Sequence, residues 1–544
     1  MMPGTGREAA QLSQPGPAGP AAHSPGGPPG TAGRWRAWLP GLACAAVPAL
    51  AAAAVTGYGL GSLSLWRDEA YSIEVARRPV SQIVTLLGHT DAVNGAYYLV
   101  LHVVIAALGT SAAAVRLPSV LAMAVAAGMT AVTGRRLARL AALPAPALTG
   151  AIAGLAVAAA PMATWYAQEA RSYAIVAMLA TIAIYLLVRA LGDPRWRWWA
   201  AYGLAVALAG AFNLLALLLV AAHAATVAAA WARRHAAPPP GVPAQQPRPW
   251  RWLGAVAAAG AVLSPLLVTG YSQRGQISWL GKPGLHDAVN LAISFAGSRL
   301  LLVPVGVVAL AGLAAGVAGR PAAQLPPAAV ALPWLVLPPA ILLAVSQISP
   351  AYDARYVLYC LPALALLVAA GLAWLAQLAA RTPLATALGG AWLPSLVAGV
   401  ALAALLVTPQ EHVRLPASRP DNLRAASAIL AAHERPGDAV FYLPSNMRVM
   451  SMGYPAPWRR LRDVALAQSP VAAANLIGAD VATRVLAKRF ADVSRVWVVT
   501  GDASHRIPAP ATPIGKEEMA LITGWRLAGQ WSANMVGLRL YQRP

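Results

Sequence analysis

The sequence WLPGLACAAVPALAAAAVTGYGLGSLSLWRDEAY occupies residues 38–71 and contains the pattern that decides the fold. Residues 38–60 are apolar and long enough to cross a bilayer, since a spanning helix needs about 20 such residues. Just past this run lies Trp66-Arg67-Asp68-Glu69, with two adjacent carboxylates. Bilayer proteins place ionisable groups sparingly, and those present often carry function. Asp68 is therefore either a polar residue where a helix leaves the membrane or a catalytic aspartate.

The composition places the chain among polytopic membrane proteins. Hydrophobic residues make up 58% and charged residues 11%, with a mean hydropathy of +0.57, whereas soluble domains carry about 25% charged residues. The net charge of +22 does not indicate nucleic acid, because most basic residues lie in short loops where they set topology. Cys44 and Cys360 both lie in apolar runs, which excludes a disulfide framework or a cysteine metal site.

Several further runs are long enough to span. They are 113–134, 141–162, 173–192, 252–270, 299–318, 327–347, 356–378 and 385–407. The run 199–232 is too long for one span, and we expect it to fold back near Asn213 into two short helices. Together with 38–60, this predicts about eleven transmembrane helices. Residues 95–109 are left out of this count, because His102 interrupts them and a span there would reverse the loop pattern. We expect them to form a surface helix within a first outer loop, 61–112.

The basic loops predict the orientation. Residues 1–36 are predicted to be a disordered cytoplasmic tail, rich in Gly, Pro, Ala and Ser. With the N-terminus inside, the arginine-dense loops all fall on the cytoplasmic side, as the positive-inside rule requires. These loops contain Arg135-Arg136-Arg139, Arg189 with Arg195-Arg197, Arg233-Arg234 through Arg248-Arg251, Arg320 and Arg381. The transmembrane domain, 37–407, then places the loops 61–112, 163–172, 271–298 and 348–355 outside, in the plasma membrane of the cell.

The last part of the chain, residues 408–544, has the composition of a small extracytoplasmic α/β domain. Residues 439–443 and 495–499 read as buried strands bounded by Gly- and Asp-containing turns. Residues 421–435 read as a helix, for which Asp421 is a plausible N-cap. No metal, phosphate-loop or nucleophile motif is present in this domain.

The predicted outer loops collect carboxylates, arginines and aromatic residues on one face. Such a face suits an anionic headgroup bound through Arg and a sugar stacked on Trp or Tyr. Arg355 begins a span at the depth of lipid phosphates, and its planar guanidinium suits phosphate binding. Glu169 and Arg171 are two residues apart and do not face each other on a helix, so any partner lies elsewhere, with Arg116 or Asp68 as candidates.

These residues form segments that resemble a known family. The segments are Leu65-Trp66-Arg67-Asp68-Glu69-Ala70-Tyr71, His89 through His102, Val115-Arg116-Leu117-Pro118-Ser119, Trp165-Tyr166-Ala167-Gln168-Glu169-Ala170-Arg171-Ser172-Tyr173, Ser278-Trp279 and Ala354-Arg355-Tyr356. In this order they resemble polyprenyl-phosphate-sugar-dependent glycosyltransferases of the GT-C fold, in the family 39 group of protein mannosyltransferase-like and aminoarabinose-transferase-like enzymes. The resemblance covers most of residues 38–407.

The resemblance implies sugar transfer from a polyprenyl-phosphate carrier to a lipid, glycan or protein acceptor outside the cell. It implies Asp68 as the base, inversion at the anomeric carbon, and mannose as a candidate sugar. The donor- and acceptor-binding residues it implies are Glu69, His89, Asp91, Asn94, Tyr97, Arg116, Gln168, Glu169, Arg171, Trp279, Arg355 and Tyr356. Glu69 is expected to balance Arg67, Arg116 or Arg171. No cofactor is certain; His89, Asp91 and Glu69 are the residues that could supply a divalent-metal site.

Two other functions fit parts of the sequence. A transporter or flippase of lipid-linked sugars would show polar residues near the middle of several spans, whereas the spans here are nearly free of charge. A scaffold built around residues 408–544 would explain that domain but not Asp68, Glu169 and Arg355 together. The sequence therefore favours a membrane glycosyltransferase.

Overall fold

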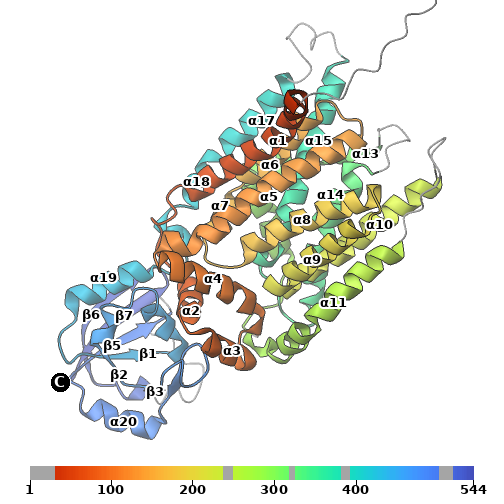
Figure 1. Ribbon diagram of the computed structural model, residues 1–544. Helices are drawn as coiled ribbons and strands as arrows, with labels where there is room; N and C mark the ends of the chain where they lie inside the picture. The colour runs from red at the N-terminus through yellow and green to blue at the C-terminus, as the bar shows by residue number, and fades with distance from the viewer. Residues whose placement is uncertain (1–30, 237–248, 278, 318–324, 382–392, 502–518) are drawn as a thin grey trace, which may run out of the picture.

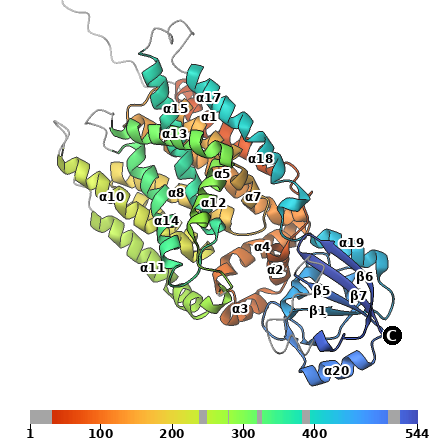
Figure 2. The ribbon, with the colours of Figure 1, turned by 180° about the vertical axis from the view of Figure 1, so that it is seen from behind.

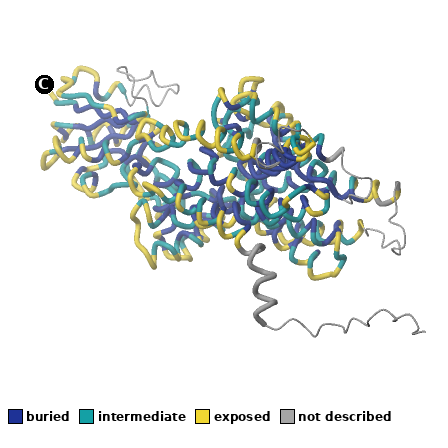
Figure 3. Tube along the Cα trace, turned by 90° about the horizontal axis from the view of Figure 1, so that it is seen from above, coloured by how far each residue is buried: buried dark blue, intermediate teal, exposed yellow. Residues whose placement is uncertain are grey.

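A computed structural model describes residues 31–236, 249–277, 279–317, 325–381, 393–501 and 519–544. Most of the predicted N-terminal tail, and most of the basic loop between Arg234 and Arg248, lie outside these residues. The described chain forms a long bundle of helices with a smaller α/β domain at one end (Figure 1). Seen from above, buried segments run through the middle of both parts (Figure 3).

The bundle follows the apolar runs of the sequence closely. Its helices are α1 (Thr31–Gly57), α5 (Ala112–Leu140), α6 (Pro146–Ala159), α7 (Pro161–Ala167), α8 (Tyr173–Gly192), α9 (Trp196–Phe212), α10 (Leu219–Ala236), α11 (Pro249–Ser272), α12 (Leu285–Ala296), α13 (Arg299–Val317), α14 (Pro327–Val345), α15 (Leu361–Ala379), α17 (Leu393–Leu405) and α18 (Val407–His412). The predicted break near Asn213 is confirmed: α9 ends there, and the Asn213 side chain accepts a hydrogen bond from the Leu215 N–H, 3.0 Å. A short 3-10 segment, Leu214–Leu218, then leads into α10.

Six helices are long and apolar enough to cross a membrane, or eight if each bent pair counts as one span. The bent pairs are α6 with α7, at 60°, and α12 with α13, at 77°. The difference from about eleven predicted spans falls on three shorter apolar stretches among the described residues. These are Ala43–Gly57 within α1, the 17-residue α9, and Leu396–His412, which covers most of α17 and α18. The chain is a multi-pass membrane protein.

Small residues allow close packing within the bundle. A Cβ atom at Gly371 on α15 would clash with the backbone carbonyl of Val308 on α13. Gly154 on α6 sits against the Ala127 carbonyl oxygen of α5, which a Cβ atom would approach to 2.6 Å. In lipid the hydrophobic effect does not drive helices together, so membrane helices associate largely through van der Waals contact. Small residues allow the close approach that such contact needs. The core of the bundle therefore depends on shape more than on polarity.

The predicted first outer loop lies at the end of the bundle next to the α/β domain (Figures 1 and 2). It contains α2 (Arg67–Ala76), α3 (Val80–His89), a 3-10 turn (Ala92–Asn94) and α4 (Gly95–Leu108). The expected helix over 95–109 thus forms, and at 14 residues it is too short to cross a bilayer. Tyr97, Tyr98 and Leu101 on α4 are buried.

The C-terminal domain contains a five-stranded sheet in the order β2-β1-β5-β7-β6. The strands are β1 (Ala439–Tyr442), β2 (Arg462–Asp463), β5 (Arg495–Thr500), β6 (Arg526–Ala533) and β7 (Val536–Gln542), and a separate pair joins β3 (Leu466–Gln468) with β4 (Ala479–Asp480). The two strands predicted from sequence, β1 and β5, are confirmed and pair in parallel. Helix α19 (Leu423–His433) packs with Trp497 on one face, and α20 (Thr483–Ala491) packs with Phe441 on the other.

One local prediction in this domain is wrong. Asp421 does not cap α19; the Asn422 side chain does so, accepting a hydrogen bond from the Ala425 N–H at 3.1 Å. Asp421 is fully buried and bound to Arg67 instead. The Asp421 carboxylate binds the Arg67 guanidinium in place of the helix N-terminus. Asn422 serves as the N-cap, because Asn caps helices about as well as Asp.

Candidate active site

Asp68 lies on the first turn of α2 and is paired with Arg355. A guanidinium nitrogen of Arg355, Nη1, donates to Asp68 Oδ2 at 2.7 Å, across 287 positions of sequence. The Asp68 side chain is 21% exposed and that of Arg355 is 11% exposed. Asp68 is therefore a partly accessible carboxylate beside a cation.

Arg355 is held by carboxylates and aromatic rings together. Its Nε lies 3.0 Å from Asp353 Oδ2, and its backbone N–H donates to Asp353 Oδ1 at 3.1 Å. The guanidinium carbon lies 5.6 Å from the centre of the Tyr173 ring and 5.5 Å from that of Tyr356. A cation over aromatic faces is stabilised by their quadrupoles. These contacts orient the guanidinium toward Asp68 at the start of the segment that leads into α15.

Glu69 has a different environment from its neighbour Asp68, because successive helix residues point roughly 100° apart. Glu69 and Arg116 are both fully buried and form two hydrogen bonds of 2.7 Å each. The remaining Arg116 donors bind the carbonyl oxygens of Leu60, Leu63 and Ser64. Of the three partners considered from sequence, Arg116 is the one that Glu69 pairs with, and the pair joins α2 to α5.

Glu169 is a buried carboxylate in the short loop between α7 and α8. It is 1% exposed, and neither carboxylate oxygen has a hydrogen-bond partner among the described residues. Burial raises the pKa of Glu169 to about 7, while Arg419 and Arg355 act to lower it and Asp68 and Glu69 act to raise it. The loop itself is held by Ser119, whose hydroxyl donates to the Glu169 carbonyl at 2.7 Å. Neither Arg116 nor Asp68 is a direct partner of this carboxylate.

This burial predicts a pH-dependent stability. Since the pKa of Glu169 is about 7 in the folded protein and 4.5 in its ordinary state, the folded form binds more protons between these values. Stability should then fall as the pH rises from roughly 5 to roughly 7. We expect the Glu169→Gln variant to lose part of this slope, measured as the thermal midpoint in detergent across that range. Glu411→Gln, which changes an exposed carboxylate, is the control; an unchanged slope in Glu169→Gln would contradict the assignment.

Arg171 and Asp91 lie near Asp68, close enough for the charges to interact. Arg171 Nη1 donates to the hydroxyl of Ser72 on α2 at 3.2 Å. Asp91 is buried and accepts hydrogen bonds from the Tyr98 hydroxyl and from Asn94 Nδ2. Burial raises the pKa of Asp91, and the charge of Arg171 opposes this rise. The Asn94 side chain is therefore engaged with Asp91.

Other residues implied by the resemblance are placed differently. His89 and Trp279 are exposed. Gln168 donates to the carbonyls of Thr56 at 2.9 Å and Tyr58 at 2.8 Å, so it anchors the loop to the end of α1. Tyr97 is buried on α4. Tyr356 contributes its ring to Arg355.

The considered metal set of His89, Asp91 and Glu69 does not come together. Glu69 is engaged with Arg116, and Asp91 with Tyr98 and Asn94. In the part of the chain that the structure describes, no three His, Cys, Asp or Glu residues are grouped so that they could hold a metal ion.

Sequence reasoning missed the residues that the C-terminal region contributes. Arg419 is 3% exposed, lies 4.2 Å over the Trp165 ring, and donates to the Trp165 carbonyl at 3.0 Å. Among the charged groups, Arg419 has the largest effect on the pKa of Glu169, which it lowers. No local sequence pattern marks Arg419, because the groups that it contacts, the Trp165 and Gln168 carbonyls, come from a distant part of the sequence. Tyr173 did lie in a quoted segment, at its last position, and could have been included for its aromatic ring.

Comparison with known proteins supports the fold. No protein-family model matches the sequence, and no curated protein matches it. The solved structure of ArnT from Cupriavidus metallidurans bound to undecaprenyl phosphate is similar, with a TM-score of 0.54 and 14% identity over 91% of this chain and 97% of that chain. The same protein in the apo state matches with a TM-score of 0.54 and 14% identity, over 93% of this chain and 98% of that chain. The chain therefore has the GT-C fold of membrane glycosyltransferases such as ArnT.

Proposed function

We propose that this protein is a membrane glycosyltransferase that moves a sugar from a polyprenyl-phosphate carrier to an acceptor outside the cell. The observation that carries this proposal is the pairing of Asp68 with Arg355, which places a carboxylate beside a guanidinium at one end of the helical bundle. The GT-C fold supports it, since the similar ArnT structure contains undecaprenyl phosphate. Mannose is the candidate sugar, and the acceptor is a lipid, glycan or protein.

In the proposed reaction an acceptor hydroxyl attacks the anomeric carbon of the sugar. A bond forms between the acceptor oxygen and that carbon, and the bond from the carbon to the phosphate oxygen breaks. Asp68 takes the hydroxyl proton, and the polyprenyl phosphate leaves with the electron pair. Arg355 and Arg171 offset the negative charge that develops on the phosphate. Direct displacement inverts the anomeric centre.

The resting contact between Asp68 and Arg355 has a consequence for this reaction. Each group neutralises the other at 2.7 Å, so a donor phosphate must compete with Asp68 for the guanidinium. Once the phosphate takes that position, the Asp68 carboxylate is released to accept a proton. Donor binding would thus prepare the base, and the base would stay paired while the site holds no donor.

We also propose that the N-terminus is cytoplasmic and that Asp68 and the C-terminal domain are extracytoplasmic. The arginines Arg135 and Arg139 lie near the C-terminal end of α5, whereas Arg116, which binds Glu69, lies near its N-terminal end. The positive-inside rule would place the end with Arg135 and Arg139 in the cytoplasm. The C-terminal domain packs at the same end of the bundle as α2 (Figure 2).

The experiment that tests the function is sugar transfer by the purified protein from a panel of polyprenyl-phosphate-linked sugars, including the mannosyl lipid. We expect one donor to be consumed, with a glycosylated acceptor detected by mass spectrometry. We expect Arg355→Ala to raise the KM for that donor by about 10- to 100-fold, since a charged hydrogen bond contributes about 1.5–3 kcal/mol. Arg355→Lys should restore part of the loss but not all, because lysine lacks the planar fork.

Arg526→Ala is the matched control, because Arg526 is exposed on the edge strand β6 and bonds Gln542. Its donor KM should match that of the wild type. An unchanged KM in Arg355→Ala would refute the phosphate role of Arg355. Movement of the lipid across vesicles without any sugar transfer would instead favour a flippase.

A further inference from the structure

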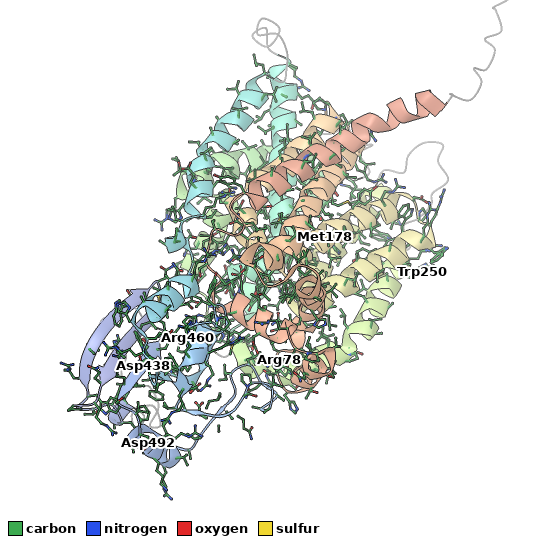
Figure 4. The ribbon with its side chains drawn as sticks, turned by 60° about the vertical axis from the view of Figure 1, so that its left-hand side comes forward. Arg78, Met178, Trp250, Asp438, Arg460 and Asp492 are labelled. Atoms are coloured by element: carbon green, nitrogen blue, oxygen red, sulfur yellow. The ribbon has the colours of Figure 1, made fainter. Side chains whose placement is uncertain are left out.

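The helix that carries Asp68 contacts the C-terminal region at several points in its first half and just past its end. The Tyr71 hydroxyl on α2 donates to the Asn446 carbonyl at 3.2 Å. Arg78, just past the end of α2, donates to the Asn475 carbonyl at 3.2 Å and lies between the bundle and the C-terminal domain (Figure 4). Ala70 of α2 is buried in the same apolar cluster as Leu423 of α19. The position of α2 therefore depends on residues far away in sequence.

The strongest of these contacts is at the first residue of α2. Asp421 is fully buried and accepts hydrogen bonds from Arg67 Nε and Nη2, both 2.7 Å, and from the Arg67 backbone N–H at 3.2 Å. The first N–H groups of a helix have no partner within the helix, and Trp66, at the cap position, provides no side-chain bond. Asp421 thus supplies a cap to α2 from 354 positions along the chain, where a negative charge is also favoured by the helix dipole.

Residues 419–424, here called the strap, bind both the segment that leads into α2 and the loop that carries Glu169. Arg424 donates to the carbonyls of Gly61 at 3.0 Å and Ser62 at 2.9 Å, in the segment that leads into α2. Arg419 donates to the carbonyls of Trp165 at 3.0 Å and Gln168 at 3.3 Å, in the loop that carries Glu169. One short segment therefore sets the relative position of the two loops.

We propose that the strap is a positioning element of the active centre, in which Asp421 holds the N-terminus of α2 so that Asp68 faces Arg355. The C-terminal region then contributes to catalysis through Asp68, although its strap touches neither sugar nor phosphate in this scheme. This inference rests on the proposed transfer reaction. Asp68 directly follows Arg67 in the chain. Loss of the contact between Arg67 and Asp421 would therefore shift the Asp68 carboxylate.

The expected effect follows from the geometry of proton transfer. A displacement of about 1 Å in a reacting group can cost about 10²-fold in rate. We expect Asp421→Ala to lower kcat by about 10- to 100-fold with a donor KM close to that of the wild type, because Arg355 keeps its own contacts with Asp353 and Tyr356. Asp421→Asn should lose less, since an amide oxygen still accepts the Arg67 N–H.

The experiment measures kcat and KM for polyprenyl-phosphomannose, or for the donor that the wild-type protein uses in the panel above. The variants are Asp421→Ala, Asp421→Asn and the control Glu434→Gln. Glu434 also lies in the C-terminal domain and pairs with Arg460, whose side chain is 72% exposed (Figure 4 labels Arg460). Asp421→Asn keeps the test usable if Asp421→Ala does not fold, and Glu434→Gln should match the wild type.

The deciding measurement repeats Asp421→Ala and Asp421→Asn in a chain that already carries Asp68→Asn. If the strap acts through Asp68, neither change lowers the residual rate further, because non-additivity reveals a shared route. A further loss of the same size in that background would show ordinary domain docking and overturn the inference, as would a wild-type kcat in both single Asp421 variants. Full activity of Asp68→Asn alone is a separate result, which refutes the proposed base.

Discussion

Sugar transfer by the Asp68→Asn variant is expected to be about 10²–10⁴-fold slower than by the wild type, which is the usual contribution of a general base. The amide can still accept a hydrogen bond from Arg355, which lies 2.7 Å from the carboxylate in the native protein. It cannot take the proton of an acceptor hydroxyl. Folding should be little affected, because Asp68 is partly exposed and the buried partner of this helix is Glu69.

The measurement is the initial rate of product formation with purified protein at saturating donor, alongside binding of polyprenyl phosphate. Binding should be equal or tighter in Asp68→Asn, because the phosphate no longer competes with a carboxylate for Arg355. Glu74→Gln is the matched control: it makes the same chemical change on the same helix, at a side chain that is 32% exposed and 4.0 Å from Arg78. A wild-type rate in Asp68→Asn would sink the assignment of the base.

A second large effect is expected at the buried pair of Glu69 and Arg116. Both side chains are fully buried and joined by two short hydrogen bonds. Removing the charge of one partner leaves the other uncompensated in a medium of low polarity, which typically costs about 3–5 kcal/mol. We expect Glu69→Gln to lower the free energy of unfolding by about this amount, since the Ala170 N–H also loses a charged acceptor at 2.9 Å.

Thermal unfolding in detergent, followed by size-exclusion chromatography of the heated samples, would measure this loss. Glu411→Gln provides the comparison, because it makes the same chemical change at an exposed residue, where substitutions usually alter stability by no more than about 0.5 kcal/mol. An unfolding midpoint in Glu69→Gln equal to that of the wild type would contradict a structural role for the pair. A loss of activity without a loss of stability would return Glu69 to the substrate-binding role implied by the resemblance.

Much of the helical bundle could be predicted because each span is specified locally. The run 173–192 forms α8 (Tyr173–Gly192), and the expected break falls at Asn213. An apolar run of sufficient length has one main solution in a bilayer, in which the helix satisfies its own backbone groups. Strands β1 and β5 were predictable for a related reason, since short β-branched and aromatic runs bounded by turns favour buried strands. The N-cap of α19 was mispredicted because two adjacent residues could both serve.

The candidate site was predictable only in part. Topology indicated that Asp68, Glu169 and Arg355 share one end of the bundle, and the structure brings them together there. Which arginine pairs with Glu69 could not be deduced, because Arg67, Arg116 and Arg171 were all plausible partners by residue type. Trp279 and His89, by contrast, belong to quoted segments and remain exposed.

The sequence by itself determined that this chain is a multi-pass membrane protein with a small α/β domain and a polar face at one end, because hydrophobic runs and turn residues act over short stretches. Only the tertiary structure decided that Asp68 faces Arg355, that Glu69 is neutralised by Arg116, and that Asp421 caps a helix 354 positions before it. Charge pairs depend on distance and burial in space, and neither quantity is encoded in the spacing of residues along the chain.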